Sequence, residues 1–230
     1  VTVSRHCSSG LNAIAVAAGR IINDGVPIAV GAGVESISLS APEGKFLHPV
    51  DKALMDQYPG LWMSMIETAD VVAKRYNVSR EYQDEFSLQS QKLMAAAQAA
   101  GKFKDEIISV KTRMKVVDKA TKSESIVDYV VDRDECNRPD TTLEGLAKLE
   151  PVKGPGKYVT AGNASQLSDG AAAVVLMEAK DAEKRGLNPL GRFVAWTAAG
   201  CEPDEMGIGP VFAVPRLLKR HGLKIEDIDI

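Results

Sequence analysis

The residue with the clearest chemical potential is Cys7, which stands where the strand-like opening at residues 1–6 turns into an apolar helical run at residues 11–22. A helix N-terminus presents unpaired backbone N–H groups and a partial positive charge, so a thiol there ionises more readily than a thiol in water. The thiolate is the nucleophilic form of cysteine. The position therefore predicts covalent catalysis by Cys7.

The opposing interpretation of Cys7 is a small core residue. Free cysteines are among the most frequently buried residue types, and a lone cysteine in an apolar setting is commonly structural. The small residues Ser8, Ser9 and Gly10 favour the reactive interpretation, because they leave space for a substrate around the sulfur. Local chemistry alone leaves both interpretations open.

The other polar candidates have weaker support. His6 adjoins Cys7, but neighbours along a strand point to opposite faces, so His6 is a poor base for that thiol. His48 and His221 have no evident partner, and no Cys, His or acidic residues recur at metal-ligand spacing, so no metal site is predicted. Arg138 is either a phosphate clamp or a solvated loop charge.

A turn-rich connector at residues 162–170 also holds polar side chains. These side chains either contact a ligand or form turns, and their residue types favour turns. They are Asn163, Ser165, Ser168 and Asp169.

Composition sets limits on compartment and partners. The 230 residues are 45% hydrophobic, enough for one large domain or two smaller ones. The net charge of −3 gives no basic field for nucleic acid or anionic membrane. Three cysteines without a CxxC pair fit a reducing compartment, and no apolar run is long enough to span a bilayer. We expect a soluble protein of the cytoplasm, or of the mitochondrial or peroxisomal matrix, and both ends of the chain look cut.

Apolar periodicity predicts an α/β protein. The opening segment, the helix at 11–22 and a buried strand at 26–34 form a strand–helix–strand unit. Gly31 and Gly33 lie inside that strand and lack the third glycine and helix start of a dinucleotide loop, so close packing explains them better.

A more charged section at about 38–157 is interpreted as an insertion. It holds a helix from Ser79 to Ala100 and a short helix opening at Thr141. The longer helix carries an apolar stripe assigned to packing, formed by Tyr82, Phe86, Leu93, Ala97 and Ala100.

The core pattern then resumes from residue 158 onward. We expect a strand at 171–177, a charged helix at 178–185 and a strand at 192–198. A final helix at 211–221 would hold Pro215 in its first turn.

Two motifs resemble those of the thiolase family, which includes acetyl-CoA acetyltransferases and 3-ketoacyl-CoA thiolases. The run Arg5-His-Cys7-Ser-Ser-Gly10-Leu resembles the nucleophile motif, and Thr160-Ala-Gly-Asn-Ala-Ser165-Gln-Leu-Ser-Asp-Gly resembles the second signature. Stretches beginning at Ser64 and Ser79 lie between them. The resemblance spans nearly the whole chain and strongly favours a reactive Cys7.

The resemblance implies a layered αβαβα core with an inserted loop domain. Residues 1–37 and 158–190 would form the first core half, and residues 38–157 the inserted, CoA-binding loop domain. Residues 191–230 would begin the second core half, which would be incomplete.

The resemblance also implies a two-step acyl transfer. Cys7 would attack the keto carbon of a 3-ketoacyl-CoA, release acetyl-CoA and pass the acyl group to a second CoA, while the reverse reaction is a condensation. Met65 would lie beside the acyl group, Arg138 near the CoA nucleotide and Ser165 at the pantetheine arm. CoA thioesters are then substrates rather than a permanently bound cofactor. The family suggests a role in fatty-acid metabolism and a homodimer or homotetramer.

The chain departs from the family pattern in three places. Ser64 stands where many biosynthetic members have His. We expect two catalytic groups beyond residue 230: the activating His of a Gly-His-Pro motif and the acid/base Cys of a Cys-x-Gly motif. We also expect a strand-rich segment before Cys7. We therefore expect a segment that cannot turn over alone.

Two alternatives to a thiolase remain. A condensing enzyme of the ketoacyl synthase kind also places Cys before small residues at a helix start. A non-catalytic acyl-CoA or lipid binder would share the fold without the chemistry.

Overall fold

The computed structural model describes residues 1–40 and 50–229, and the chain forms two compact units. Unit 1 comprises Val1–Val72 and Leu167–Ile230, and unit 2 comprises Ala73–Gln166. The sequence-based domain boundaries, at 37/38, 157/158 and 190/191, stay a prediction. His48 lies outside the described residues.

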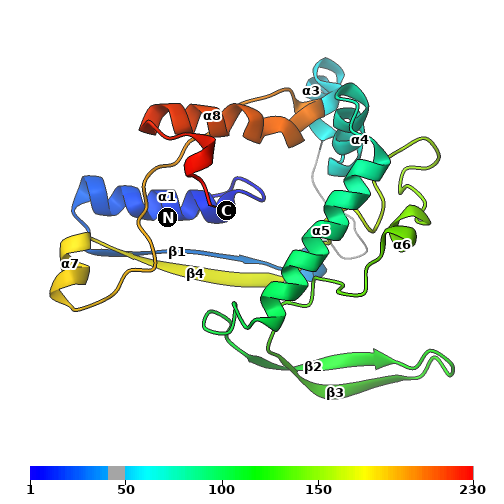
Figure 1. Ribbon diagram of the computed structural model, residues 1–230, viewed down its shortest axis with the longest axis horizontal. Coiled ribbons are helices and arrows are strands. Elements are labelled where there is room, and N and C mark those ends of the chain that lie inside the picture. Colours follow the sequence, from blue (N-terminus) through cyan, green and yellow to red (C-terminus); the bar gives the residue numbers. More distant parts are fainter. Residues whose placement is uncertain (41–49, 230) are drawn as a thin grey trace. The chain divides into compact units, whose positions relative to one another are not determined.

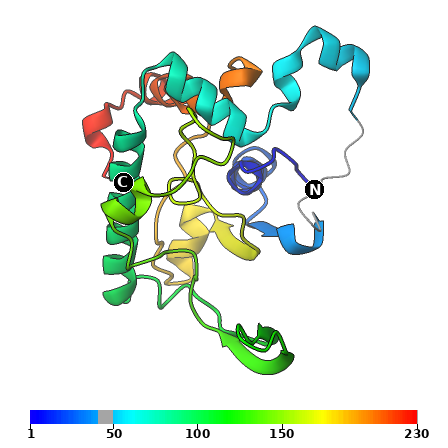
Figure 2. The same cartoon turned by 90° about the vertical axis from the view of Figure 1, so that its right-hand side faces the viewer.

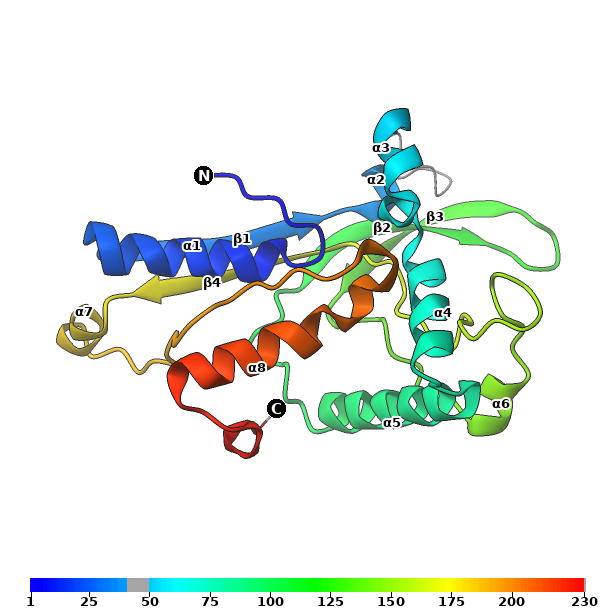
Figure 3. The ribbon, with the colours of Figure 1, turned by 90° about the horizontal axis from the view of Figure 1, so that it is seen from above.

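Unit 1 is built on one helix and two strands. Strands β1 (Ile28–Glu35) and β4 (Gly170–Met177) pair antiparallel, from Ile28 opposite Met177 to Glu35 opposite Gly170. Helix α1 (Ser9–Asp24) lies along this pair (Figures 1 and 3). The helix ends at Gly25, whose φ of 69° is the left-handed conformation that glycine adopts without steric cost. The predicted first helix and both of these strands are confirmed.

Two other predicted strands of unit 1 do not form. Residues 1–6 contain only an isolated bridge between Arg5 and Cys7, and residues 192–198 have no regular structure. The prediction that the opening segment, the first helix and the next strand form one strand–helix–strand unit is therefore wrong. Strand β1 pairs with β4 and not with the opening segment. A strand needs a neighbour for its backbone groups, and a local apolar pattern does not say which segment supplies it.

Gly31 shows why small residues occur in β1. A Cβ atom added at Gly31 would lie 2.9 Å from Ile14 Cα and 3.1 Å from Ile14 N, so the strand contacts the α1 backbone directly. An added Cβ at Gly33 would have no heavy atom within 4 Å. Close packing therefore explains Gly31, as predicted, whereas the same prediction for Gly33 is wrong.

Gly31→Ala is expected to lower the free energy of unfolding by about 1–3 kcal/mol, because α1 must shift to accommodate the methyl group. Urea denaturation of the protein measures this loss. Gly33→Ala, on the same strand, is the matched control and should change stability by less than about 0.5 kcal/mol. Equal effects of the two substitutions would refute the close approach.

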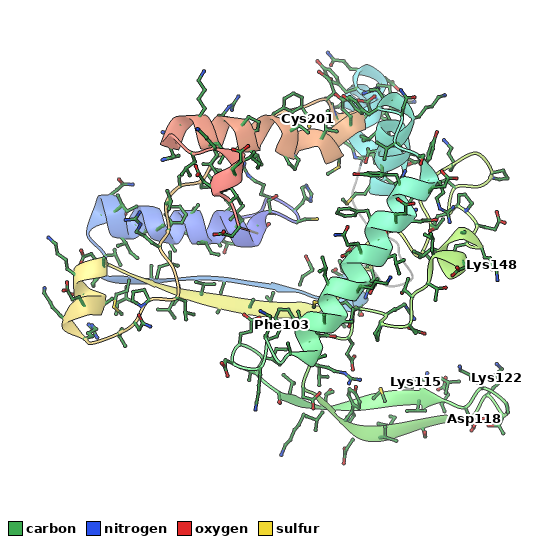
Figure 4. The ribbon with its side chains drawn as sticks, viewed as in Figure 1. Phe103, Lys115, Asp118, Lys122, Lys148 and Cys201 are labelled. Carbon is green, nitrogen blue, oxygen red and sulfur yellow. The ribbon has the colours of Figure 1, made fainter. Side chains whose placement is uncertain are left out.

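The remaining elements of unit 1 are short, except for two helices. They are α2 (Ile37–Ser40), α3 (Lys52–Gln57), η2 (Pro59–Trp62), α4 (Met65–Arg75), α7 (Ala179–Lys184), η3 (Pro203–Ile208), α8 (Gly209–His221) and η4 (Ile225–Asp227), of which α4 continues past the end of unit 1. The predicted helix at 211–221 begins earlier, at Gly209, so Pro215 lies inside α8 and not in its first turn. Cys201 lies beside η3, where its Sγ donates to the Met206 carbonyl at 3.9 Å (Figure 4).

Unit 2 contains a long helix, a hairpin and a short helix. Helix α5 (Arg80–Ala99) begins at Ser79, whose hydroxyl accepts from the Tyr82 N–H, as predicted. Strands β2 (Val110–Val117) and β3 (Glu124–Val131) pair antiparallel and stand clear of α5 (Figure 2). Helix α6 (Leu143–Ala147) follows.

The hairpin turn is held by Asp118, which lies with Lys122 at the tip (Figure 4). Its Oδ1 accepts from the N–H groups of Ala120 and Thr121 at 2.9 and 2.7 Å. The Thr121 N–H stabilises the carboxylate and so lowers the pKa of Asp118.

The apolar stripe of α5 differs from the prediction. Tyr82, Phe86 and Leu93 are each more than 60% exposed, so within the described residues these side chains are not packed. Periodicity identified the helix correctly, but it cannot identify what covers the apolar face.

Across residues 1–40 and 50–229, every helix is too short or too polar to cross a lipid bilayer.

Candidate active site

Cys7 lies in the tight turn that leads into α1. Its side chain is exposed, the helix begins two residues later at Ser9, and Ser8 is the N-cap residue. The Ser8 N–H donates to the Arg5 carbonyl and the Ser9 N–H to the His6 carbonyl, both at 3.0 Å. Among the described residues Cys7 is therefore not packed in a core, and its sulfur is open to a reactant.

The other two cysteines, both among the described residues, can be compared with Cys7. Cys136 is exposed and Cys201 is partly exposed, and none of the three is in a disulfide. Exposure alone therefore does not distinguish Cys7 from Cys136. What distinguishes Cys7 is its place at the start of a 16-residue helix.

Met65 is the second candidate in unit 1. It is the first residue of α4, and its side chain is 61% exposed. The N–H of the preceding Ser64 donates to Glu67 Oε2 at 2.9 Å, and the Glu67 N–H donates to Ser64 Oγ at 3.4 Å, which is the reciprocal arrangement of a capping box. Ser64 therefore starts α4. The spacing Ser64-Met-Ile-Glu67 is the sequence signal of this helix start, although no helix was predicted there.

Arg138 and Ser165 both belong to unit 2. The Arg138 N–H donates to Gln91 Oε1 of α5 at 2.7 Å, and its carbonyl accepts from the Thr141 hydroxyl at 2.7 Å. Arg138 is exposed, and its guanidinium takes part in none of the ion pairs found among the described residues. The backbone is therefore fixed while the side chain is directed to solvent.

The segment around Ser165 is tied to the segment around Arg138. Gln166, which follows Ser165, donates from Nε2 to the Cys136 carbonyl, two residues before Arg138. The Gln98 side chain donates to the Asp134 carbonyl at 2.9 Å and anchors the same loop to α5. The structure thus brings together the two segments that carry the predicted CoA contacts.

A buried polar network supports the loop that bears Ser165. Asp84, only 2% exposed, accepts from Arg80 Nε at 2.8 Å and from Asn163 Nδ2 at 3.1 Å. Arg80 also donates to the carbonyls of Leu146 and Leu149, at 2.7 and 3.1 Å. Asn163 is therefore a structural cross-link and not a simple turn former.

The same loop closes on itself at Thr160, which is fully buried. Its hydroxyl accepts from the Gly162 and Asn163 N–H groups at 3.2 and 3.3 Å, and its own N–H donates to Asn163 Oδ1 at 2.8 Å. A Cβ at Gly162 would lie 2.4 Å from Leu146 Cδ2. The second sequence motif therefore encodes a compact loop, in which a side chain at position 162 would have to displace the ends of Leu146 and Leu149.

Asp169 joins the ends of β4 and β1. Its Oδ1 accepts from the Ser38 N–H at 3.0 Å and its Oδ2 from the Ser36 hydroxyl at 3.1 Å. The backbone bond from Ser38 is the main reason that the pKa of Asp169 lies below its ordinary value. Asp169 therefore links the segment before β4 to the segment after β1, and it is not a simple turn former.

We expect the bonds from Ser36 and Ser38 to Asp169 to be fully formed above the ordinary aspartate pKa. They should weaken as pH falls through the lowered pKa of the folded state, because protonation removes the acceptor charge. A carbon-detected NMR titration of the Asp169 carboxyl measures the midpoint. A midpoint at or above the ordinary aspartate value would contradict the hydrogen-bond geometry.

Two further features of the part of the chain that the structure describes bear on ligand binding. His, Cys, Asp and Glu side chains gather there in no group of three that could bind a metal ion. A shallow hollow of about 590 Å³ lies on the hairpin and contains none of the four candidate residues. It is lined by Lys111, Thr112, Arg113, Asp128, Tyr129 and Val130.

Family models and curated relatives match this chain closely. A model of the thiolase N-terminal domain matches residues 1–180, and one of the thiolase C-terminal domain matches residues 187–230. The 3-ketoacyl-CoA thiolase of Bacillus subtilis (strain 168) is 44% identical over 230 residues, covering 100% of this chain and 58% of the relative. The beta-ketoadipyl-CoA thiolase of Pseudomonas putida is 44% identical over 250 residues, covering 100% and 59%.

A solved structure agrees with these matches. The dimeric peroxisomal thiolase of Saccharomyces cerevisiae superposes with a TM-score of 0.84 at 32% identity, over 99% of this chain and 56% of that one. The chain thus spans little more than half the length of these proteins. The likeness confirms the predicted thiolase-type α/β fold. Together, the two family models and these relatives show that the chain belongs to the thiolase family.

Proposed function

We propose that the chain carries the nucleophile of an acyl-CoA C-acyltransferase of the thiolase type. The enzyme would cleave a 3-ketoacyl-CoA with CoA, or condense two molecules of acetyl-CoA in reverse. The observation that carries this proposal is the exposed Cys7 in the turn before α1. The names of the relatives, 3-ketoacyl-CoA thiolase and beta-ketoadipyl-CoA thiolase, support the substrate class.

In the first step, the Cys7 thiolate attacks the keto carbon of the substrate. The bond between this carbon and the adjacent α-carbon breaks, its electron pair goes to the α-carbon, and a proton is added there to give acetyl-CoA. In the second step, the thiolate of a second CoA attacks the acyl thioester and releases Cys7. A backbone N–H at a helix start suits the stabilisation of the oxyanion that forms in each step.

Unit 2 would supply contacts to CoA. The exposed Arg138 would lie near the nucleotide, and the exposed Ser165 at the pantetheine arm. The link between their segments, through Gln166 and the Cys136 carbonyl, supports a common role. Met65, at the start of α4, would contact the acyl group. CoA thioesters enter as substrates, without a permanently bound cofactor.

The direct test is thiolysis. The protein, in the full length in which it occurs naturally, is incubated with a 3-ketoacyl-CoA and CoA, and the products are separated by chromatography. Residues 1–230 alone are expected to give no turnover. We expect acetyl-CoA and the acyl-CoA shortened by two carbons in equal amounts. A ketoacyl-synthase-type enzyme would yield neither product from these reactants, and a non-catalytic binder would leave both reactants unchanged.

We further propose that the protein assembles as a homodimer or homotetramer in the cytoplasm or in an organelle matrix. The dimeric yeast thiolase supports self-association, and its peroxisomal origin supports a matrix location among the alternatives. Sedimentation velocity would distinguish the two assemblies, and a monomer at micromolar concentration would overturn the proposal.

A further inference from the structure

Ser9 makes contacts around Cys7 that its position in a helix does not require. The Arg5 N–H donates to Ser9 Oγ at 2.8 Å, and Ser9 Oγ donates to the His6 carbonyl at 2.6 Å. Arg5 and His6 precede Cys7 and Ser9 follows it. The single hydroxyl therefore closes a hydrogen-bonded ring that has Cys7 in its middle.

The backbone held by this ring is unusual. His6 has a φ of 46°, in the left-handed region that residues other than glycine rarely adopt. Such a conformation persists only where the surrounding structure holds it, and the group that holds the His6 carbonyl is Ser9, through its hydroxyl and its N–H. The direction in which the chain enters Cys7 thus depends on Ser9.

Ser8 provides an internal comparison. It also lies between Cys7 and the helix, and it is the N-cap residue of α1, yet its side chain makes no capping hydrogen bond. Ser8 and Ser9 are therefore adjacent residues of the same type, but only the Ser9 hydroxyl bridges to the backbone before Cys7.

We propose that Ser9 is a positioning residue for the nucleophile, whose hydroxyl fixes the Arg5–His6 backbone and so aims Cys7 Sγ at the substrate carbon. This inference rests on the proposed function. A displacement of the reacting atoms by about 1 Å can lower a rate by about 100-fold. Loss of the Ser9 hydroxyl should therefore slow attack by Cys7 and leave substrate affinity nearly unchanged.

The test compares variants of equal bulk, Ser9→Thr and Ser9→Val, with Ser8→Ala as the control. The measured quantities are the single-turnover rate of Cys7 acylation by acetyl-CoA and the concentration for half-saturation. We expect S9V to acylate about 10- to 100-fold more slowly than S9T, with half-saturation unchanged within about twofold. S8A should match the unsubstituted protein.

The outcomes separate this inference from the proposed function. If S9V and S9T acylate at the same rate, Ser9 has no positioning role, although the thiolase chemistry stands. If S9V differs from S9T only in half-saturation, the role of Ser9 is in binding and the inference is overturned. If the unsubstituted protein forms no acyl adduct, the proposed function itself fails. Thermal melts of both variants show whether each is folded during the assay.

Discussion

Replacing Cys7 by alanine is expected to lower kcat for thiolysis by at least about 10⁴-fold, because the nucleophile forms the covalent intermediate and nothing in the ring around it replaces the sulfur. The exposed side chain makes few packing contacts that alanine would lose. Stability should therefore stay close to that of the unsubstituted protein. Steady-state kinetics and a thermal melt on the same preparations measure the two effects.

The matched control for this substitution is Cys201→Ala. Cys201 is partly exposed, and its Sγ donates to the Met206 carbonyl beside η3, a structural contact. We expect kcat/KM within about twofold of the unsubstituted protein, since substitutions away from a functional site are commonly near neutral. Retention of thiolysis by C7A at more than one hundredth of the original rate would show that another group is the nucleophile.

Asp84→Ala is expected to lower the free energy of unfolding by about 3–5 kcal/mol, which is typical when one partner of a buried ion pair is removed. The Arg80 side chain is only 18% exposed and would keep its charge without the carboxylate that neutralises it. Asn163 Nδ2 would also lose an acceptor. Urea denaturation measures the loss, and weaker CoA binding should accompany it because the network supports the loop that bears Ser165.

A second Arg–Asp pair, on α1, provides the control for this prediction. Arg20 and Asp24 on α1 have the same spacing of four residues, but their side chains are 58% and 43% exposed. Because exposed pairs of this kind contribute about 0.3–0.5 kcal/mol, Asp24→Ala should have little effect. If D84A and D24A were equally destabilising, burial would not be what makes the Arg80–Asp84 pair important.

The sequence predicted the elements whose signals are local. Ser79 begins α5, because a capping hydrogen bond depends on neighbours in the chain. A strand depends on a partner far away in the sequence: the apolar run at 171–177 pairs with β1, whereas the predicted strand at 192–198 has no regular structure.

The same distinction applies to the candidate site. Cys7 is a candidate from its local surroundings, whereas Met65, Arg138 and Ser165 are candidates only through family resemblance. The link from Asp84 to Asn163 joins residues that are 79 positions apart, so no spacing rule could reveal it. The ring made by the Ser9 hydroxyl is local, but it depends on the left-handed conformation of His6, which the sequence does not signal.

The most direct test of the account is to find the acyl group on the protein. The protein is incubated with acetyl-CoA, quenched in acid and digested, and the peptides that contain Cys7 and Cys136 are compared by mass spectrometry. We predict a thioester-linked acetyl group on the Cys7 peptide, removed by added CoA, and none on the Cys136 peptide, although both residues are exposed. An unmodified Cys7, or equal acetylation of the two cysteines, would contradict the claim that Cys7 is the acyl-carrying nucleophile.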